Sequence, residues 1–380
     1  MRFTVSPASF ADAVKAVSKV ISKKPTMPVL SNILLRPGEA ADELLLTGCD
    51  GDNTLTVCMK VDDGEDLHPM LLPADMVSKA LGAVGQLPVT VEVEKNGEVL
   101  LSDFMGEYRF MGSADVAGFP QAPVVEGAEL IIPALPLADL LSSAMRFTAS
   151  DDLRPQMCGV LCEFGAQGTM TVAASDSKKL FCDTIGGVAV PSDTSVILPA
   201  TVASILVGMA TSGTEETVTV QTDGQRVLAG KGGSSIVARL TEGRFPRYQA
   251  VIPKNNDRVA ELDRAQLIAA IDRAVIASNV ATSQLKLSFD GVSTLHIESR
   301  DIDYSTSAKV RISTERQTNL GAQMAVGIRG TFLLDILKNA FRGRSKVILK
   351  MSDPTKAILV KENEESERTA LIMPMQLTDF

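Results

Sequence analysis

The 380-residue sequence contains no tryptophan, and aromatic residues make up only 4% of it. It has only two histidines, His68 and His296, which argues against catalysis or metal binding built on several imidazoles. No apolar run reaches the roughly 18 residues that a membrane helix needs, and the first residues lack the basic and apolar pattern of a secretory leader. These absences predict aliphatic cores and a cytoplasmic location.

The five cysteines are odd in number and scattered through strand-like segments, which favours reduced, buried thiols over a disulfide framework. They are Cys49, Cys58, Cys158, Cys162 and Cys182. Cys158 and Cys162 have a C-x3-C spacing, and strand alternation would place both on one face. No second Cys or His pair lies near them, so core packing is favoured over zinc. We predict no metal and no cofactor.

The charge balance does not point to nucleic acid at first sight. Lys and Arg number 37 and Asp and Glu 46, giving a net charge of −9, whereas a dedicated DNA-binding protein usually carries a basic excess. An acidic exterior with a basic inner face would give the same total. The length suits two or three domains, so the positions of the cations have to be considered domain by domain.

Landmarks recur along the chain at a spacing of about 126 residues. Phe119-Pro120, Phe245-Pro246 and Met373-Pro374 place their prolines 246 − 120 = 126 and 374 − 246 = 128 residues apart. An aspartate that ends a strand recurs with steps of 126 and 125, at Asp50, Asp176 and Asp301. Such self-similarity is typical of tandem units. We predict domains at 1–124, 125–252 and 253–380.

Each third has the same order of predicted elements: a short strand, an amphipathic helix, a hairpin, a second helix and closing strands. The apolar stripes of the first helices are Phe10, Val14, Val17 and Ile21, then Leu137, Leu140, Leu141 and Met145, then Leu267, Ile271 and Val275. Pro73 and Pro199 mark the start of the second helix in the first two thirds. The fold class is therefore α+β. Tandem units leave unpaired strand edges at their ends, and a head-to-tail dimer would pair them.

Four segments resemble one known family. They are Lys24-Pro25-Thr26-Met27-Pro28-Val29-Leu30, Ala174-Ser175-Asp176-Ser177-Lys178-Lys179-Leu180, Glu242-Gly243-Arg244-Phe245-Pro246-Arg247-Tyr248 and Met373-Pro374-Met375-Gln376-Leu377. Together they are similar to matching stretches of the bacterial DNA polymerase III beta subunit family, the DNA sliding clamps. The resemblance implies three tandem repeats of the DNA-clamp fold, with two helices inside and sheets outside, closing as a head-to-tail dimeric ring.

The same resemblance implies a function without catalysis. A sliding clamp is a processivity factor that encircles duplex DNA regardless of sequence, and it tethers the replicative polymerase and other DNA-processing proteins. Polymerase and clamp-loader subunits would dock through short peptide motifs in a pocket between the second and third domains. By position, that pocket would be lined by Met157, Ser175, Ser177, Lys178, Lys179, Leu180, Pro246, Val251, Leu371, Met373, Pro374, Met375, Gln376 and Leu377. The dimer junction would place Tyr108 and Phe110 of one copy against Ile276 and Ala277 of another.

The sequence departs from the family pattern at two places in this expected pocket. Many members carry Gly-His-Arg where this chain has Ser177-Lys178-Lys179, and a basic residue where it has Gln376. The last residues, Gln376 to Phe380, themselves resemble the Gln-Leu-x-x-Phe peptides that clamps bind. Buried core between the domains is the competing interpretation of the apolar pocket residues, because Met in a strand is usually core.

Cations cluster on the polar faces of the predicted helices and near their ends. They are Lys15, Lys19, Lys23, Lys24, Lys79, Arg146, Arg264, Arg273, Lys338 and Arg342. A solvated face normally mixes charges, so a mostly cationic face on an acidic protein favours contact with DNA phosphates. The scarcity of aromatic side chains argues against stacking on single strands and favours a duplex.

Two other functions compete with the clamp interpretation. An interaction scaffold that never touches DNA would fit the same repeats, and an enzyme could be built around Asp176 and Lys178. The Gly230–Ser234 segment lacks the order of a phosphate-binding loop and is interpreted as a hairpin turn. An enzyme would need a deep pocket with converging titratable groups, whereas a scaffold would not be retained on circular DNA.

Overall fold

The computed structural model describes residues 1–94, 96–151, 153–321 and 324–377. The chain forms two compact units. Unit 1 comprises Met1–Leu135 and Ile205–Leu240, and unit 2 comprises Pro136–Ser204 and Thr241–Phe380. Both units mix helices with antiparallel sheets, so the predicted α+β class is confirmed. In the part of the chain that is described, no helix is long and apolar enough to cross a membrane.

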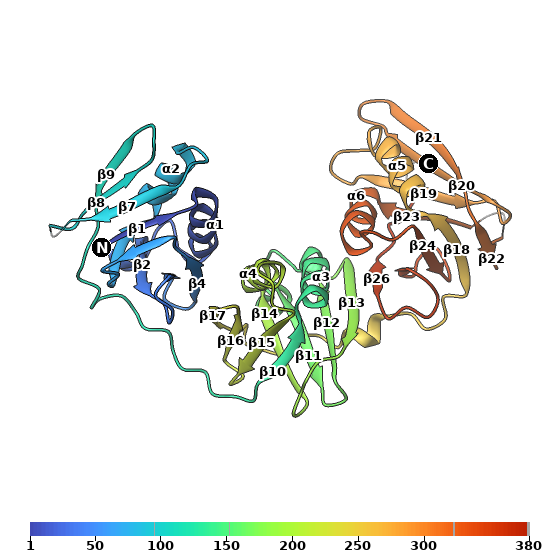
Figure 1. The fold of residues 1–380 in the computed structure, drawn as a ribbon. Helices are drawn as coiled ribbons and strands as arrows, with labels where there is room; N and C mark the ends of the chain where they lie inside the picture. Colours follow the sequence, from blue (N-terminus) through green and yellow to red (C-terminus); the bar gives the residue numbers. More distant parts are fainter. Residues whose placement is uncertain (95, 152, 322–323, 378–380) are drawn as a thin grey trace. The chain divides into compact units, whose positions relative to one another are not determined.

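Unit 1 contains a five-stranded and an eight-stranded sheet, with strand orders β5-β1-β7-β8-β9 and β10-β15-β16-β17-β4-β3-β2-β6 (Figure 1). Its strands are β1 (Arg2–Val5), β2 (Asn32–Pro37), β3 (Glu43–Cys49), β4 (Thr54–Lys60), β5 (Asp63–Glu65), β6 (Met70–Pro73), β7 (Val89–Val93), β8 (Glu98–Ser102), β9 (Glu107–Met111), β10 (Leu130–Pro133), β15 (Thr217–Thr222), β16 (Arg226–Lys231) and β17 (Ser234–Arg239). Helix α1 (Pro7–Val17) packs against α2 (Ala74–Ala83), β3 and β4. Helices α3 (Ala134–Ala144) and α4 (Ala200–Thr211) cross the unit boundaries in sequence.

Unit 2 contains a nine-stranded and a four-stranded sheet, with strand orders β14-β11-β12-β13-β26-β25-β24-β18-β22 and β21-β20-β19-β23. Its strands are β11 (Gly159–Gly165), β12 (Thr169–Ser175), β13 (Lys179–Gly186), β14 (Thr194–Pro199), β18 (Arg258–Asp263), β19 (Gln284–Phe289), β20 (Thr294–Asp301), β21 (Thr306–Ser313), β22 (Arg316–Thr318), β23 (Met324–Arg329), β24 (Lys346–Met351), β25 (Ile358–Lys361) and β26 (Thr369–Ile372). Its helices α5 (Arg264–Val275) and α6 (Gly330–Asp335) pack against each other, and a π-helical turn (Ile336–Ala340) extends α6.

Helix α1 shows how local sequence sets the elements. Pro7 occupies its first turn, where a missing N–H costs nothing, and Phe10, Val14 and Val17 are at most 1% exposed. Ser6 is the N-cap residue, but its side chain makes no capping hydrogen bond. The α-helix ends at Val17 and continues as a 3-10 turn (Ser18–Val20).

Two further details of the sequence interpretation are wrong. Lys19 lies in the 3-10 turn beyond α1, because the α-helix is one turn shorter than the apolar stripe predicted; Lys23 and Lys24 follow that turn, near the helix end as expected. Cys158 follows the 3-10 turn Pro155–Met157 and precedes β11, so strand alternation does not pair it with Cys162. The predicted turn at Gly230–Ser234 is confirmed, since Gly232 and Gly233 adopt φ values of 56° and 75° between β16 and β17.

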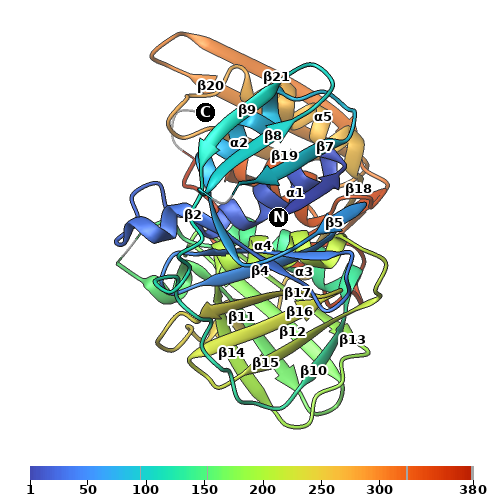
Figure 2. The same ribbon diagram turned by 60° about the vertical axis from the view of Figure 1, so that its left-hand side comes forward.

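Each large sheet is continuous across strands that are far apart in sequence. In unit 1, β4 pairs with β17, with Leu55 opposite Ile236; we call this contact the first junction (Figures 1 and 2). In unit 2, β13 pairs with β26, with Leu180 opposite Leu371; this is the second junction. Both contacts are antiparallel ladders, so backbone hydrogen bonds join segments separated by about half the chain.

The edge strands of the five-stranded sheet are β5 and β9, and those of the four-stranded sheet are β21 and β23. β9 pairs with β8 and β21 pairs with β20, and neither has a second neighbour among the described strands. Large apolar side chains near these edges are exposed, including Met111 at 60% and Tyr304 at 77%. An open edge of this kind is a template for pairing with another strand.

Candidate partner-binding site

The second junction encloses an apolar cluster. Leu180 and Leu371 face each other across β13 and β26, and both are at most 3% exposed. Phe245 and Tyr248, from the segment that follows β17, pack into the same cluster. The Tyr248 hydroxyl donates a 2.8 Å hydrogen bond to Glu163. Burial, together with this carboxylate, raises the pKa of Tyr248 above its ordinary value.

The C-terminal segment after β26 leads from the second junction to β23 and β19 of the four-stranded sheet, where hydrogen bonds to its backbone hold it. The Met373 N–H donates to the Lys178 carbonyl at 2.9 Å, and the Met375 N–H donates to the Gly327 carbonyl at 2.8 Å. The Gln284 side chain donates to the Gln376 carbonyl at 2.6 Å. Only glycine fits at position 327, because a Cβ there would lie 2.4 Å from the Met375 carbonyl oxygen. The structure therefore brings together the predicted segments Ser175–Leu180 and Leu371–Leu377.

Asp176 shapes the turn that leads into β13. Its carboxylate accepts the N–H groups of Lys178 at 2.9 Å and Lys179 at 2.8 Å, and Ser177 adopts a φ of 74°. Asp50 and Asp301 accept backbone N–H groups in the same way at their own turns. The recurring aspartate is thus a turn-forming residue, and its carboxylate is engaged by backbone amides rather than directed toward chemistry.

The predicted pocket residues differ in accessibility. Four of them are buried, namely Met157, Lys179, Leu180 and Leu371, at 8% exposure or less. Val251 is 58% exposed and Met373 45% exposed. The remaining residues are partly or fully exposed: Ser175, Ser177, Lys178, Pro246, Pro374, Met375, Gln376 and Leu377. Thr378–Phe380, which resemble a clamp-binding peptide, lie outside the described residues. Val251 and Met373 are therefore the most exposed large apolar side chains of the predicted pocket.

The side chain of Lys179 does not join these exposed residues. Its ammonium group lies 3.1 Å from the Asp335 carboxylate and donates to the Arg146 carbonyl. It also lies 5.2 Å and 5.3 Å from the ring centres of Phe147 and Phe332. Since neighbouring residues of a strand point to opposite faces, this ammonium lies on the face opposite to Leu180.

A buried ion cluster on that opposite face was not foreseen from the sequence. Arg368 is 6% exposed and donates to the Asp183 carboxylate at 2.7 Å, to the Asp139 carboxylate and to the Ala340 carbonyl at 2.8 Å. It thereby links β26 to β13, to α3 and to the end of the π-helical turn. An arginine directly before a buried strand, and an aspartate inside one, were the available signals, because buried charges are normally paired.

The predicted DNA-facing cations fall into two groups. Lys79 forms an ion pair with Asp75, Lys338 lies 3.0 Å from Asp272, and Arg264 donates to the Leu337 carbonyl at 2.8 Å. Around Lys79 and Lys338 the surface therefore mixes charges, unlike the mostly cationic face predicted from the sequence. The other cations are exposed: Lys15, Lys19, Lys23, Lys24, Arg146, Arg273 and Arg342.

The predicted dimer residues lie at or near the open edges. Tyr108 and Phe110 belong to β9, and Tyr108 is 38% exposed. Ile276 and Ala277 directly follow α5, which packs against β21, and Ile276 is 84% exposed.

Comparison with known proteins identifies the class. A sliding clamp from Pseudomonas aeruginosa, solved with griselimycin bound, matches with a TM-score of 0.88 at 23% identity, covering 99% of this chain and 100% of that one. A DNA polymerase III beta subunit from Thermotoga maritima matches with a TM-score of 0.87 at 18% identity, covering 99% and 100%. The fold is that of a DNA sliding clamp.

The sequence comparisons show the family to which the chain belongs. Residues 1–117 match the model of the DNA polymerase III beta subunit N-terminal domain, and residues 249–376 match that of its C-terminal domain. The beta sliding clamp of Escherichia coli K12 is 26% identical, covering 99% of this chain and 100% of that protein. That of Pseudomonas aeruginosa is 25% identical with the same coverage. The chain belongs to the DNA polymerase III beta subunit family.

Proposed function

We propose that this protein is a DNA sliding clamp: a non-enzymatic processivity factor that encircles duplex DNA and tethers polymerases to it. Membership of the DNA polymerase III beta subunit family supports this function. The three domains are 1–124, 125–252 and 253–380, and two copies form a closed ring in the cytoplasm. No metal or cofactor takes part.

The observation that carries this proposal is the correspondence between the two junctions and the two open edges. β4, β13 and β21 each follow one of the three aspartate turns. β17, β26 and β9 each form the last strand of their proposed domain. A strand of the first set pairs with a strand of the second set at each junction: β4 with β17 at the first and β13 with β26 at the second. The remaining strands, β21 and β9, each have one edge without a neighbour among the described strands, so β21 of one copy pairs with β9 of another. Two such contacts close the ring.

DNA contact in this proposal is made by the exposed cations near the helix ends. Lys15, Lys19 and Lys24 neutralise phosphates and read no bases, so the ring moves along the duplex regardless of sequence. The charge total does not oppose this role, because a local basic surface is compatible with a net charge of −9.

Partners dock at the exposed apolar residues of the predicted pocket. A short peptide motif of a polymerase or clamp-loader subunit places its apolar anchor on Val251, Met373 and Met375. Burying one such anchor contributes about 1.5–3 kcal/mol. The two methionines suit several partners because their thioether side chains adapt to different shapes. Ser177, Lys178 and Gln376, which are exposed and differ from the residues that many members carry, set the partner preference.

Retention on DNA tests the function. A ring loaded by a clamp loader onto closed circular DNA remains bound in high salt and is released when a restriction enzyme linearises the circle, because it slides off the ends. An interaction scaffold is not retained on either form. Equal lifetimes on circular and linear DNA would contradict topological binding.

A further inference from the structure

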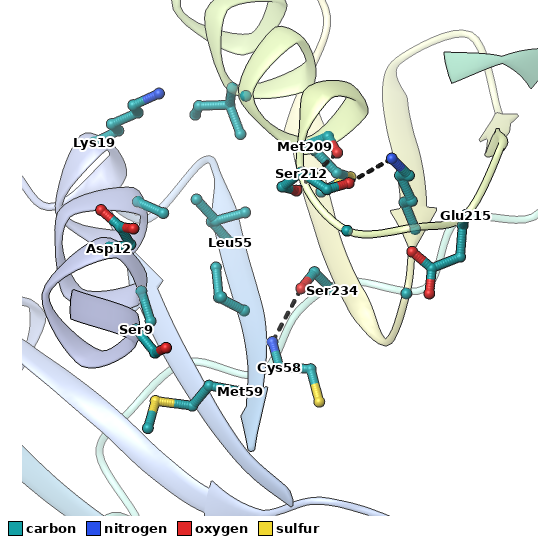
Figure 3. A pocket seen from close by; sticks show the side chains of 18 of the residues that line it. Ser9, Asp12, Lys19, Leu55, Cys58, Met59, Met209, Ser212, Glu215 and Ser234 are labelled. Atoms are coloured by element: carbon teal, nitrogen blue, oxygen red, sulfur yellow. Dashed lines mark hydrogen bonds between the residues drawn. The ribbon is translucent and has the colours of Figure 1, made fainter. Parts of the chain in front are cut away.

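Unit 1 contains a cavity of about 530 Å³ beside the first junction (Figure 3). One wall is formed by α1 and β4, including Asp12, Ala13 and Leu55. The facing wall is formed by the end of α4 and the turn between β16 and β17. A cavity of this volume lies within the range of ligand sites.

At the second junction, an arginine side chain occupies the place that corresponds to this cavity. Val57 lies seven residues after the turn aspartate Asp50, as Asp183 does after Asp176. One step beyond the last paired residues of each ladder, Ser234 falls opposite Val57, and Arg368 falls opposite Asp183. Ser234 therefore occupies the position that Arg368 occupies in unit 2.

The helices correspond in the same way. The buried residues Phe10, Ala13 and Val14 of α1 match Leu137, Leu140 and Leu141 of α3. Asp12 consequently stands in the position of Asp139, the carboxylate that accepts a hydrogen bond from Arg368.

The cavity exists because three of these positions carry smaller side chains, and a fourth carries an apolar side chain in place of a charged one. Ser234 replaces arginine, Ala13 replaces leucine, Leu55 replaces phenylalanine and Val57 replaces aspartate, relative to unit 2. The acidic residue Asp12 is kept, whereas the cation that would partner it is missing. In the second junction the same space is filled by Arg368, whose guanidinium lies 5.8 Å from the Phe181 ring centre.

Two carboxylates, Asp12 and Glu215, and three lysines, Lys19, Lys60 and Lys231, line the cavity, so its charges are mixed. Lys231 is 9% exposed, and its ammonium donates to the carbonyls of Ala210, at 2.9 Å, and Ser212. Lys60 lies 3.4 Å from the Asp42 carboxylate. The carboxylates of Asp12 and Glu215 come from facing walls, and no ion pair joins either to another described residue.

We propose that this cavity binds the arginine side chain of a partner protein, with Asp12 taking the role that Asp139 has toward Arg368. The guanidinium donates to the Asp12 carboxylate, and Glu215 adds negative charge from the opposite wall. The aliphatic stem packs on Leu55, Met59 and Met209. Arginine suits the site better than lysine because its planar group can hydrogen-bond to a carboxylate while stacking on apolar surface.

The test uses two fluorescently labelled peptides titrated against the full-length protein, acetyl-Gly-Arg-Gly-amide and its citrulline counterpart. Citrulline has almost the same shape but no charge. The arginine peptide is expected to bind at least tenfold more tightly, and Asp12→Asn is expected to remove this preference. Glu39→Gln is the matched control, because Glu39 is an exposed carboxylate of unit 1 that does not line the cavity.

A second variant tests the same site by placing an arginine of the protein itself in the cavity. Ser234→Arg supplies the guanidinium that unit 2 carries, and it is expected to abolish binding of the arginine peptide while raising the thermal midpoint. The Ser234 hydroxyl accepts a 3.0 Å hydrogen bond from the Cys58 N–H, which this variant gives up (Figure 3). Equal affinity for both peptides, or a preference that survives Asp12→Asn, would overturn the proposal. So would the absence of binding at millimolar peptide.

Discussion

The first and second junctions use the same backbone ladder but differ in the side chains that fill the space beside it. At the second junction, Arg368 and Phe181 fill the space between β13 and α3, and the arginine is held by two aspartates. At the first junction, Ser234 and Leu55 leave a cavity of about 530 Å³. Main-chain pairing therefore fixes the architecture, whereas the side chains beside it decide whether a junction is packed solid or keeps an open site.

The two junctions also differ in the chain segment that continues from their last strand. After β26, backbone hydrogen bonds tie Met373 to Lys178 in the second junction and Met375 to Gly327 in β23. Val251 and Met373 are exposed apolar residues of the same unit. Substitutions that disrupt one junction at a time, with the other as the reference, should therefore separate packing from partner binding.

The largest effect is expected from Arg368→Met. Removing the guanidinium leaves Asp183, which is 7% exposed, without its cation, and breaking a buried ion pair in this way costs about 3–5 kcal/mol. Guanidinium denaturation of the full chain measures this change in the free energy of unfolding. Arg342→Met, at an exposed site, is the control and should change stability by less than about 0.5 kcal/mol. A similar, small change in both variants would show that the ion cluster is not stabilising.

Reciprocal changes at Leu140 and Ala13 exchange the packing of the two junctions. Leu140 is fully buried, so Leu140→Ala should destabilise the protein by about 2–5 kcal/mol through lost contacts and a new cavity. Ala13→Leu should instead stabilise it by about 0.5–2 kcal/mol, because the added side chain enters an existing cavity. Thermal and denaturant unfolding of both variants provide the comparison. Destabilisation by Ala13→Leu would mean that the first junction has no room for the larger residue.

A charge at the exposed surface of the second junction should weaken partner binding without disturbing the fold. Val251→Asp is expected to lower the affinity for a clamp-binding peptide at least tenfold, or about 1.4 kcal/mol. Val124→Asp is the matched control, since this valine is 82% exposed in the corresponding linker of the first junction. Peptide titration should therefore separate the two variants, and equal affinities would remove Val251 from the docking surface.

The smallest effect concerns alkaline pH. The pKa of Tyr248 is raised in the folded state, mainly by burial, so the folded protein keeps this proton when the unfolded chain, with a pKa of about 10, has lost it. This contribution to stability is full below pH 10 and is lost as the pH rises above it. The thermal midpoint of Tyr248→Phe should decline less steeply between pH 9 and 11 than that of the unaltered protein. Tyr304→Phe, at a 77% exposed site, should keep the original slope.

Much of the local structure could be predicted from the sequence, because its signals are local. The stripe of Phe10, Val14 and Val17, the glycine turn at Gly232 and Gly233 and the aspartate turns all follow from neighbouring residues. The family motifs also indicated which segments meet beside Leu180. The helix end at Val17 was missed because Ile21 extends the apolar pattern past it.

The junctions themselves could not be predicted by local reasoning. β13 and β26 are about 190 residues apart, and nothing near Lys179 indicates which distant strand it joins. Arg368 was overlooked because its role depends on two carboxylates from separate elements. The cavity depends on the absence of bulk at Ser234 and Ala13, which becomes visible only when the two junctions are compared in register.

The most direct test of the central claim, that β9 and β21 form a third junction between two copies, is the mass of the protein in solution. Light scattering at micromolar concentration should give twice the 40.4 kDa of one chain. Ile276→Asp should shift the mass toward a single chain, because it buries an unpaired charge in the contact. Val292→Asp, at a 76% exposed position in the β19–β20 turn, should remain dimeric. A mass of 40.4 kDa for the unaltered protein would contradict the ring.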